Sequence, residues 1–555
     1  MRTEPKTIRK AGQLSLFEIP ESVGVSIDVA ATRLGVSSAT IRNWLKTGYL
    51  SAAGNGRIDV ESLDSFLREH AGKQKLTSRA NKSQKDSHDH SEVSARFISR
   101  IVENSGDLHV VGTEYQAALS DSHRNKEGIY YTPESIVADM LRPPREDVSS
   151  KTFCDPCCGS GNFIVRALEV GFKPENIVGC DTDPVAVELT KGRILALSGY
   201  DSRSIYNESF LDRAIRTDAS YDYVFTNPPW GKKLFKDRKD FYASIFHAGK
   251  SNDTCSLFFF ACLKSLKYSG RLGFLLPEAF FNIAMYETAR RAALNLKIER
   301  LVDYDKPFKG LLTRAQAIVL DTKKTNDTSH PICCEFSGNT HLRENSTFRK
   351  NPNAILNFKC NSNDSAIIDR AFSVPHITLE GRARWGLGIV TGNNKKFVKH
   401  TPAEGYIAVF KGADLRANEL KKPHCFIPSD LSLYQQVAPV ELYEANEKLI
   451  YKFISSDLCF FTDSKQRYVL NSANMLIPNR DFPISCQQLA CLLNSRFINF
   501  IFRSTYNTHK VLRGDLEMLP IHVDYFDQHE IFEEESYLNH LGIKKGQNGA
   551  YRVKE

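Results

Sequence analysis

Residues 153–163 have the sequence FCDPCCGSGNF, which follows a short apolar strand start and leads into a helical stretch at residues 164–169. Gly159 and Gly161 allow a tight turn and let a ligand approach the backbone closely. The order of strand, glycine turn and helix is that of a ligand-binding α/β domain. The loop alone does not identify the ligand, because nucleotide, phosphate and cofactor loops all contain such glycines.

Short apolar or β-branched runs alternate with helical stretches around this loop, up to about Lys324. Most of these runs end in an acidic or polar residue, which is where an open α/β sheet has its ligand contacts. We therefore predict a parallel α/β sheet, with strands at residues 177–180, 223–226, 273–276, 301–304 and 317–320.

Two carboxylates narrow the choice of ligand. Asp181 closes the strand that follows the loop, where an acid can accept hydrogen bonds from ribose hydroxyls. Asp155 precedes the glycines, where its charge would repel a pyrophosphate, so a ligand with an ammonium group and a ribose fits better than a dinucleotide. S-adenosylmethionine has that pattern of charges. The alternative is that both residues only cap turns at strand ends, as aspartate often does.

A second motif, NPPW at residues 227–230, follows a predicted strand at residues 221–226. Pro228 and Pro229 restrict the backbone, so the strand end offers two fixed acceptors, the Asn227 side-chain oxygen and the Pro228 carbonyl. The exocyclic amino group of a base requires such a pair, because its lone pair is delocalised into the ring unless both N–H groups are held. Trp230 would supply a stacking face for an extrahelical base. The alternative is a proline turn with a packed tryptophan.

Together the motifs resemble those of the amino-methyltransferases of restriction–modification systems, in the adenine-specific class in which the cofactor motifs precede the catalytic one. The resemblance covers residues 130–322 and rests on YTP at 131–133, DP through GNF at 155–163, GCDTDP at 179–184, FLD at 210–212 and NPPW at 227–230. It implies a Rossmann-like domain that binds S-adenosylmethionine and methylates N6 of adenine in a specific duplex sequence.

The resemblance also implies roles for single residues. Thr132 and Asp155 would contact the methionine moiety of the cofactor, Asp181 its ribose and Asp212 its adenine amino group. Phe308 matches the aromatic residue that stacks on the flipped base, as Trp230 would. Trp230 departs from the commoner Tyr or Phe, which weakens the choice of adenine over cytosine. The cofactor-binding candidates are Tyr131, Thr132, Pro133, Asp155, Pro156, Gly159, Gly161, Phe163, Asp181 and Asp212, and the catalytic candidates are Asn227, Pro228, Pro229 and Trp230.

After Asn326 the sequence becomes irregular, aromatic-rich and basic. Its pattern resembles the target-recognition domain of the same family, so we predict a catalytic domain over residues 96–325, an α+β target-recognition domain over 326–530 and a polar tail over 531–555. Basic side chains on loops suit phosphate contacts and base readout, although such charges also occur on ordinary solvated surfaces. The DNA-binding candidates in this region are Lys395, Lys396, Arg496, Lys510 and Arg513.

Residues 25–71 contain a helix, a glycine turn and a second helix preceded by Ser37, which is helix-turn-helix spacing. The pattern resembles winged helix-turn-helix modules of the mercury-resistance-regulator and excisionase type. Its candidates for major-groove contacts are Ser38, Thr40, Arg42 and Asn43. The alternative is a small helical domain for protein contacts. Residues 1–24 form an extension, and residues 72–95 are predicted to be a disordered linker because they nearly lack apolar side chains.

Composition sets wider limits. The 555 residues carry a net charge of +8, which fits a nucleic-acid partner without establishing one. Thirteen cysteines, an odd number, argue against a disulfide framework, and the C-x-x-C at 154–157 lacks the second pair that a metal site needs, so no metal is expected. No signal peptide is evident, and the longest apolar stretch, residues 255–263, is too short for a membrane span. We expect a cytoplasmic bacterial or archaeal protein without a membrane partner.

The predicted function is therefore adenine-N6 modification of double-stranded DNA in a restriction–modification system, with any cognate endonuclease encoded separately. Three alternatives stay open: a cytosine-N4 methyltransferase, a methyltransferase of protein glutamine, and a DNA-binding regulator with a vestigial methyltransferase fold. The YTP motif and the long C-terminal region argue against a glutamine methyltransferase. The intact glycine loop and Asn227 argue against a vestigial fold.

Overall fold

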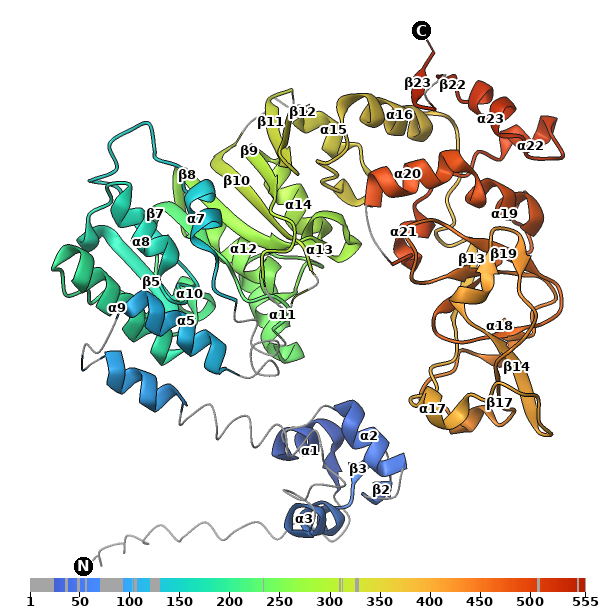
Figure 1. The fold of residues 1–555 in the computed structure, drawn as a ribbon, viewed down its shortest axis with the longest axis horizontal. Coiled ribbons are helices and arrows are strands. Elements are labelled where there is room, and N and C mark those ends of the chain that lie inside the picture. The colour runs from blue at the N-terminus through green and yellow to red at the C-terminus, as the bar shows by residue number, and fades with distance from the viewer. Residues whose placement is uncertain are drawn as a thin grey trace, which may run out of the picture. The chain divides into compact units, whose positions relative to one another are not determined.

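The computed structural model describes residues 24–34, 38–46, 50–54, 57–69, 93–101, 103, 107–119, 130–232, 234–308, 311, 313–324, 329–506, 510–546 and 549–554. The chain divides into two compact units, residues 1–124 and 125–555, and many of their elements are labelled in Figure 1. Nearly all of the predicted N-terminal extension and most of the predicted linker lie outside the described residues, whereas residues 93–95, at the end of that linker, are helical. No helix among the described residues is long and apolar enough to cross a membrane.

The first unit contains the predicted helix-turn-helix pattern. Trp44 packs on Phe66 with ring centroids 4.6 Å apart, and Ile41, Leu50 and Ile58 are buried around them. Its elements are β1 (Val25–Ser26), α1 (Ile27–Leu34), α2 (Ser38–Lys46), β2 (Ala52–Gly54), β3 (Arg57–Ile58), α3 (Val60–Glu69), a helix at residues 93–101 and α5 (Leu108–Ala118). The predicted catalytic domain, residues 96–325, includes most of the helix at residues 93–101 and all of α5, which pack on each other through Phe97 and Tyr115 and are grouped with this first unit.

The second unit is built on a nine-stranded sheet with the order β12-β11-β9-β10-β8-β7-β4-β5-β6. The strands are β4 (Phe153–Asp155), β5 (Ile177–Asp181), β6 (Ile205–Asn207), β7 (Tyr221–Thr226), β8 (Leu266–Pro277), β9 (Leu296–Asp303), β10 (Ala315–Lys324), β11 (Pro331–Phe336) and β12 (Asn339–Glu344). Strands β6, β5, β4, β7 and β8 are mutually parallel, so their carboxyl ends share one edge. The predicted α/β class is confirmed.

The prediction of a parallel sheet is wrong for β10, which runs antiparallel to both β8 and β9. The connection from β9 to β10, residues 304–314, contains no helix among its described residues. A parallel crossover needs about a dozen or more residues, usually with a helix, so this short connection returns the chain antiparallel.

Helices flank the sheet (Figure 1). Their apolar side chains share one core with it. Helix α9 begins at Pro184 with Asp183 as its N-cap and ends at Gly199 in the left-handed region, as the local sequence favours. The helices are α7 (Glu134–Met140), α8 (Asn162–Glu169), α9 (Pro184–Ser198), α10 (Phe210–Arg216), α11 (Lys236–Ile245), α12 (Thr254–Lys264), α13 (Ala279–Asn282), α14 (Glu287–Leu294) and α15 (Asn345–Arg349).

The catalytic sheet extends past the predicted boundary at residue 325. Strand β11 pairs parallel with β9, β12 pairs with β11, and Phe348 and Leu356 are buried in the same core. The sequence of β12 gave little signal, because an edge strand keeps polar and charged side chains. The sheet and its core therefore continue past residue 325, as far as Phe358.

Among its described residues the C-terminal part has two larger β-sheets, two two-stranded sheets (β15-β16 and β22-β23) and two apolar clusters. One sheet has the order β13-β21-β18-β19 and the other β17-β14-β20. The elements are α16 (Ser362–Ser373), β13 (Ala383–Leu387), α17 (Asn394–Phe397), β14 (Tyr406–Phe410), β15 (Leu415–Arg416), β16 (Glu419–Leu420), β17 (Phe426–Pro428), α18 (Val440–Tyr443), β18 (Lys448–Lys452), β19 (Phe460–Asp463), β20 (Tyr468–Val469), β21 (Ala473–Pro478), α19 (Cys486–Asn494), α20 (Arg496–Tyr506), α21 (Arg513–Glu517), α22 (Asp524–Gln528), α23 (Glu534–His540), β22 (Ile543–Lys545) and β23 (Tyr551–Val553).

The predicted polar tail is wrong, because residues 534–553 fold as α23, β22 and β23. Tyr537, Leu541 and Ile543 are fully buried, and the Tyr537 hydroxyl lies 2.6 Å from Nδ1 of the buried His522. A few large apolar residues anchor this segment to the core, although its average composition is polar.

Candidate active site

The glycine loop lies at the carboxyl edge of the sheet, between β4 and α8. Gly159 and Gly161 have φ angles of 51° and 85°, a region that favours glycine. A Cβ atom on Gly161 would lie 2.8 Å from Oγ1 of Thr190, and one on Gly159 would lie 3.2 Å from the Tyr131 ring. Both glycines are therefore required by conformation and by space.

Buried polar contacts hold this loop in place. The Arg193 guanidinium, on α9, donates to the Ser160 carbonyl at 2.8 Å and to Oδ1 of Asn162 at 2.6 Å. The Asn162 amide in turn donates to the Thr132 carbonyl at 2.8 Å. The loop and the segment 130–133 are thus fixed to one another.

Asp155 ends β4 and is 1% exposed. Its Oδ1 accepts a hydrogen bond from the Cys157 amide at 3.1 Å, and its Oδ2 is buried without a hydrogen-bond partner among the described residues. Burial raises the pKa of Asp155 to about 7; the nearby Thr226 hydroxyl and the Cys157 amide lower it, and the charge of Asp181 raises it further. A cation beside Oδ2 would stabilise the ionised carboxylate.

Asp181 ends β5, next to β4 in the sheet. Its Oδ2 accepts from the Gly159 amide and its Oδ1 from the Asp183 amide, both at 2.9 Å. Burial raises its pKa to about 6. Both aspartates therefore accept turn amides, as the alternative interpretation held, but these bonds leave Oδ2 of Asp155 unused.

Asp212 lies in the first turn of α10, which follows β6. Its Oδ1 accepts a hydrogen bond of 2.6 Å from the hydroxyl of Tyr242 on α11. Because β4, β5 and β6 are neighbours, Asp155, Asp181 and Asp212 follow one another along the same edge of the sheet.

Asn227 comes directly after β7, and its orientation is fixed by a distant segment. Its Nδ2 donates to the Tyr130 carbonyl at 3.0 Å. This bond identifies the amide nitrogen and leaves Oδ1 buried without a partner among the described residues. A buried acceptor without a donor costs about 1–3 kcal/mol, so this oxygen is preorganised for an incoming N–H group.

Trp230 and Phe308, the two predicted stacking residues, lie next to each other and fill the space between them. Their ring centroids are 5.3 Å apart with an interplanar angle of 88°, and both side chains are buried. The Trp230 Nε1 atom donates to the Leu275 carbonyl at 3.4 Å. A base stacked between two parallel rings needs roughly 7 Å, twice an optimal contact. Stacking on both rings therefore remains a prediction, and it requires one ring to move.

Known proteins share this combination of sites and folds. Residues 106–330 match the N-6 DNA methylase family, residues 407–521 the TaqI-like C-terminal specificity domain, and residues 25–71 a helix-turn-helix domain. The type II methyltransferase M.VspI of Vibrio sp. (strain 343) is 48% identical over 406 residues, which are 73% of this chain and 98% of the relative. This chain belongs to the type II DNA methyltransferases.

More distant proteins also match parts of this chain. The modification methylase CviBIII of Paramecium bursaria Chlorella virus NC1A is 24% identical to the methyltransferase, over 38% of this chain and 54% of the relative. The solved structure of the type IIL restriction-modification enzyme MmeI in complex with DNA is 13% identical with a TM-score of 0.52, and the match covers 77% of this chain and 72% of the MmeI chain.

The methyltransferase brings most of the predicted cofactor residues to one edge of the sheet. Thr132 and Pro156 are buried there, and Pro133 is the N-cap of α7. Phe163 differs, because its ring is buried in the hydrophobic core beneath the loop, with its centroid 6.5 Å from that of the Phe225 ring. The roles of all these residues toward a cofactor remain predictions.

The predicted DNA-contact residues are scattered. Lys395 and Lys396 lie on α17, and Arg496 begins α20 at the opposite end of the C-terminal part (Figure 1). Arg513 pairs with Glu517 at 2.8 Å, and Lys510 is exposed. In the first unit Ser38 donates to Asp28 at 2.6 Å and Arg42 is exposed, whereas the side chains of Thr40 and Asn43 lie outside the described residues.

Three residues that hold the site together were not predicted from the sequence: Tyr130, Arg193 and Tyr242. Arg193 could have been suspected as a lone arginine in an apolar helix turn, RILAL. Tyr130 acts through its backbone carbonyl, and Tyr242 through a helix distant in sequence, so neither left a local signal.

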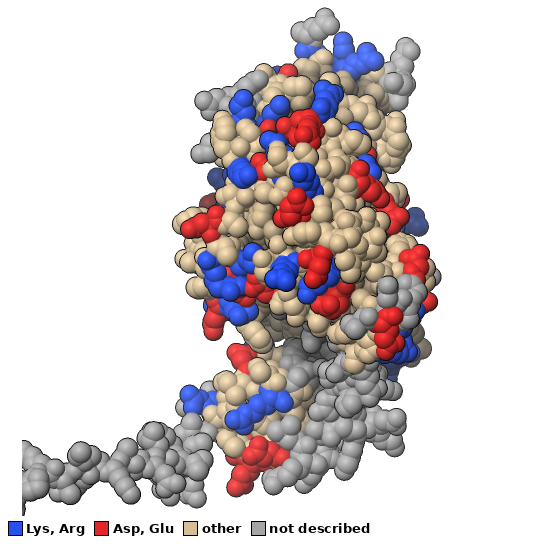
Figure 2. All heavy atoms as spheres, turned by 90° about the vertical axis from the view of Figure 1, so that its left-hand side faces the viewer, with Lys and Arg blue, Asp and Glu red and all other residues tan. Residues whose placement is uncertain are grey.

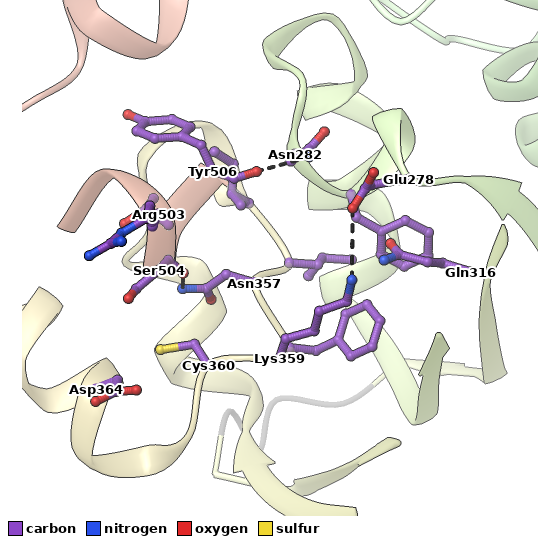
Figure 3. A pocket seen from close by; sticks show the side chains of 15 residues that line it. Glu278, Asn282, Gln316, Asn357, Lys359, Cys360, Asp364, Arg503, Ser504 and Tyr506 are labelled. Atoms are coloured by element: carbon purple, nitrogen blue, oxygen red, sulfur yellow. Dashed lines mark hydrogen bonds and ion pairs between the residues drawn. The ribbon is translucent and has the colours of Figure 1, made fainter. Parts of the chain in front are cut away.

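A pocket lies where the catalytic part meets the C-terminal part, and none of the predicted site residues lines it. Asn282 donates to the Tyr506 carbonyl at 2.9 Å and Asn357 to the Ser504 carbonyl at 3.0 Å (Figure 3). Lys359 pairs with Asp303 and lies 3.7 Å from Glu278. These contacts join the two parts of the second unit.

Outside this site, the charged side chains and the cysteines of the described residues form no second binding or metal site. On the face drawn in Figure 2, Lys and Arg lie among Asp and Glu, and neither sign forms a continuous patch. All thirteen cysteines are free thiols. Within the described ranges no group of three or more His, Cys, Asp or Glu side chains is arranged to hold a metal ion.

Proposed function

We propose that this methyltransferase transfers a methyl group from S-adenosylmethionine to N6 of an adenine flipped out of duplex DNA within a specific sequence. The observation that carries this proposal is the hydrogen bonding of the Asn227 side-chain amide. Its Nδ2 is held by the Tyr130 carbonyl, and its Oδ1 is a buried acceptor with no partner among the described residues.

An exocyclic amino group supplies the missing donor. One of its N–H groups would bond to Oδ1 of Asn227 and the other to the carbonyl of Pro228. Two fixed acceptors favour a tetrahedral nitrogen whose lone pair points at the methyl donor, which is electrostatic preorganisation rather than general-base catalysis. The two prolines keep these acceptors in place during the reaction.

The carboxyl edge of the sheet suits the proposed cofactor. The unpartnered Oδ2 of Asp155 can accept the ammonium group, and a side chain at Gly159 or Gly161 would fill the space beside the loop. Asp181 would hold the ribose and Asp212 the adenine amino group. When bound, S-adenosylmethionine supplies an electrophilic methyl group.

Adenine is preferred to cytosine because the catalytic part matches the N-6 DNA methylase family. We propose that the C-terminal part selects the sequence, since it matches a specificity domain, and that any cognate endonuclease is a separate chain. Lys395, Lys396, Arg496, Lys510 and Arg513 are the proposed contacts to double-stranded DNA on this part.

The test is the variant Asn227→Ala, with Asn339→Ala at the exposed first residue of β12 as the control. Single-turnover transfer from labelled cofactor should slow by about 10²-fold or more in Asn227→Ala, with cofactor affinity unchanged. Nucleoside analysis of DNA from cells that express the wild type should show N6-methyladenine. A product of N4-methylcytosine would refute the choice of base, and normal turnover in Asn227→Ala would refute the mechanism.

A further inference from the structure

Tyr242 links the segment that follows the catalytic motif to the cofactor edge of the sheet. It lies on α11, which begins six residues after Trp230. Its side chain is 2% exposed and its hydroxyl donates to Oδ1 of Asp212 at 2.6 Å. A buried tyrosine hydroxyl aimed at one carboxylate oxygen fixes the direction in which the other oxygen points.

The neighbours of both side chains maintain this contact. The Tyr242 ring stacks on Phe246 with centroids 6.3 Å apart. Burial and the adjacent Asp212 raise the pKa of Tyr242 to about 12, so its hydroxyl remains a donor. The neighbouring Arg213 donates to Glu208 at 3.0 Å and lies over the Tyr206 ring, so it is engaged elsewhere.

The position of Asp212 shows which ligand group it would meet. Asp155 and Asp181 end adjacent strands, and Asp212 follows the next one. The strands from β4 to β6 span about 10 Å. A ligand with its ammonium group at Asp155 and its ribose at Asp181 extends its base toward Asp212.

We propose that Tyr242 is a positioning residue that orients Asp212 so that its free carboxylate oxygen accepts the 6-amino group of the cofactor's adenine. Tyr242 does not touch the ligand itself. The proposal rests on the proposed function, because it needs the adenosine cofactor. It adds that the helix following the catalytic motif sets the affinity for that cofactor.

The test compares two ligands that differ at one group. S-adenosylhomocysteine carries the 6-amino group, and S-inosylhomocysteine has a 6-oxo group in its place. Calorimetry measures the Kd of each for the full-length wild type, for Tyr242→Phe and for Tyr286→Phe. Tyr286 is a matched control, because it is also a buried tyrosine bonded to a carboxylate, that of Asp253 at the start of α12.

Tyr242→Phe should weaken S-adenosylhomocysteine about fivefold to tenfold and change S-inosylhomocysteine by less than about twofold. Tyr286→Phe should leave the ratio of the two Kd values unchanged. This ratio does not depend on the fraction of folded protein, so a partly unfolded variant still gives a result. In an Asp212→Ala background Tyr242→Phe should have no further effect on the ratio, since the two residues act as one unit.

Equal weakening of both ligands by Tyr242→Phe would show a merely structural role and overturn the proposal. An unchanged Kd for S-adenosylhomocysteine would overturn it as well. If the wild type bound neither ligand, the proposed function would fall instead, so the two failures are distinguishable.

Discussion

Cofactor affinity should depend on pH through Asp155. Its pKa of about 7 exceeds the ordinary 3.8 because the group is buried, so near neutral pH a large fraction of the free protein carries a neutral carboxyl. A ligand with an ammonium group requires the ionised form. Affinity should therefore rise with pH until Asp155 is ionised, and binding should release a proton.

The magnitude follows from the two raised pKa values. Lowering the pH from 7.0 to 5.5 should weaken binding by about 16-fold, because the ionised fraction of a carboxylate with a pKa of about 7 falls by that factor. Asp181, with a pKa of about 6, adds about fourfold over the same range. The range stops at pH 7 because the amino group of the ligand itself has a pKa of about 8.

Calorimetry with S-adenosylhomocysteine measures both the Kd and the released proton, in buffers of different ionisation enthalpy. Asp155→Asn should bind more weakly at pH 7 and keep only the roughly fourfold dependence from Asp181. Asp147→Asn is the control, because exposed Asp147 accepts the amide two residues ahead at 2.9 Å, as Asp155 does at 3.1 Å. A flat wild-type Kd, or full pH dependence in Asp155→Asn, would refute the assignment of the ammonium group.

The same linkage predicts that stability without cofactor falls as pH rises from about 4 to 7, because the folded state binds more protons there than the unfolded state; a melting temperature that rises over this range would contradict it. Arg290→Met should lower the free energy of unfolding by about 3 kcal/mol or more, since the buried guanidinium donates to the carbonyls of Phe280, Ile283, Asn353 and Ala354; denaturant titration measures this, and a loss under about 1 kcal/mol would be inconsistent. A variant that begins at residue 93 should methylate the same DNA sequence as the full chain while binding DNA more weakly at physiological salt; sequencing of the methylated DNA decides, and a changed target would assign specificity to the first unit. Phe308→Ala should reduce base flipping, seen as lower 2-aminopurine fluorescence at the target position; unchanged fluorescence would argue against a stacking role.

The sequence predicted those parts of the site that local backbone chemistry determines. Glycines, prolines and strand-end aspartates restrict conformation within a few residues, so the loop at 153–163 and the acceptor at Asn227 were recognisable. The contacts that finish the site join distant segments. Asn227 is oriented by the Tyr130 carbonyl, 97 residues away, and Asp212 by Tyr242, 30 residues away.

The fold shows the same division. Hydrophobic runs located β5, β7 and β10, but a run carries no direction, so the antiparallel course of β10 was not predictable from it. The folded C-terminal segment was missed because five buried apolar or aromatic residues determine how it docks, whereas the composition averages over the whole segment.

The buried Arg290 limits where this enzyme can be recombined with its relatives. Its guanidinium binds carbonyls from α13 and from the segment at residues 353–354, which leads out of the catalytic sheet. A chimaera that exchanged everything after residue 325 would remove two strands from the sheet and half of the arginine's acceptors. A junction just after Phe358 would keep both, together with Leu356 and Phe358, which are buried in the catalytic core, so engineering of new sequence preferences should graft foreign specificity domains there.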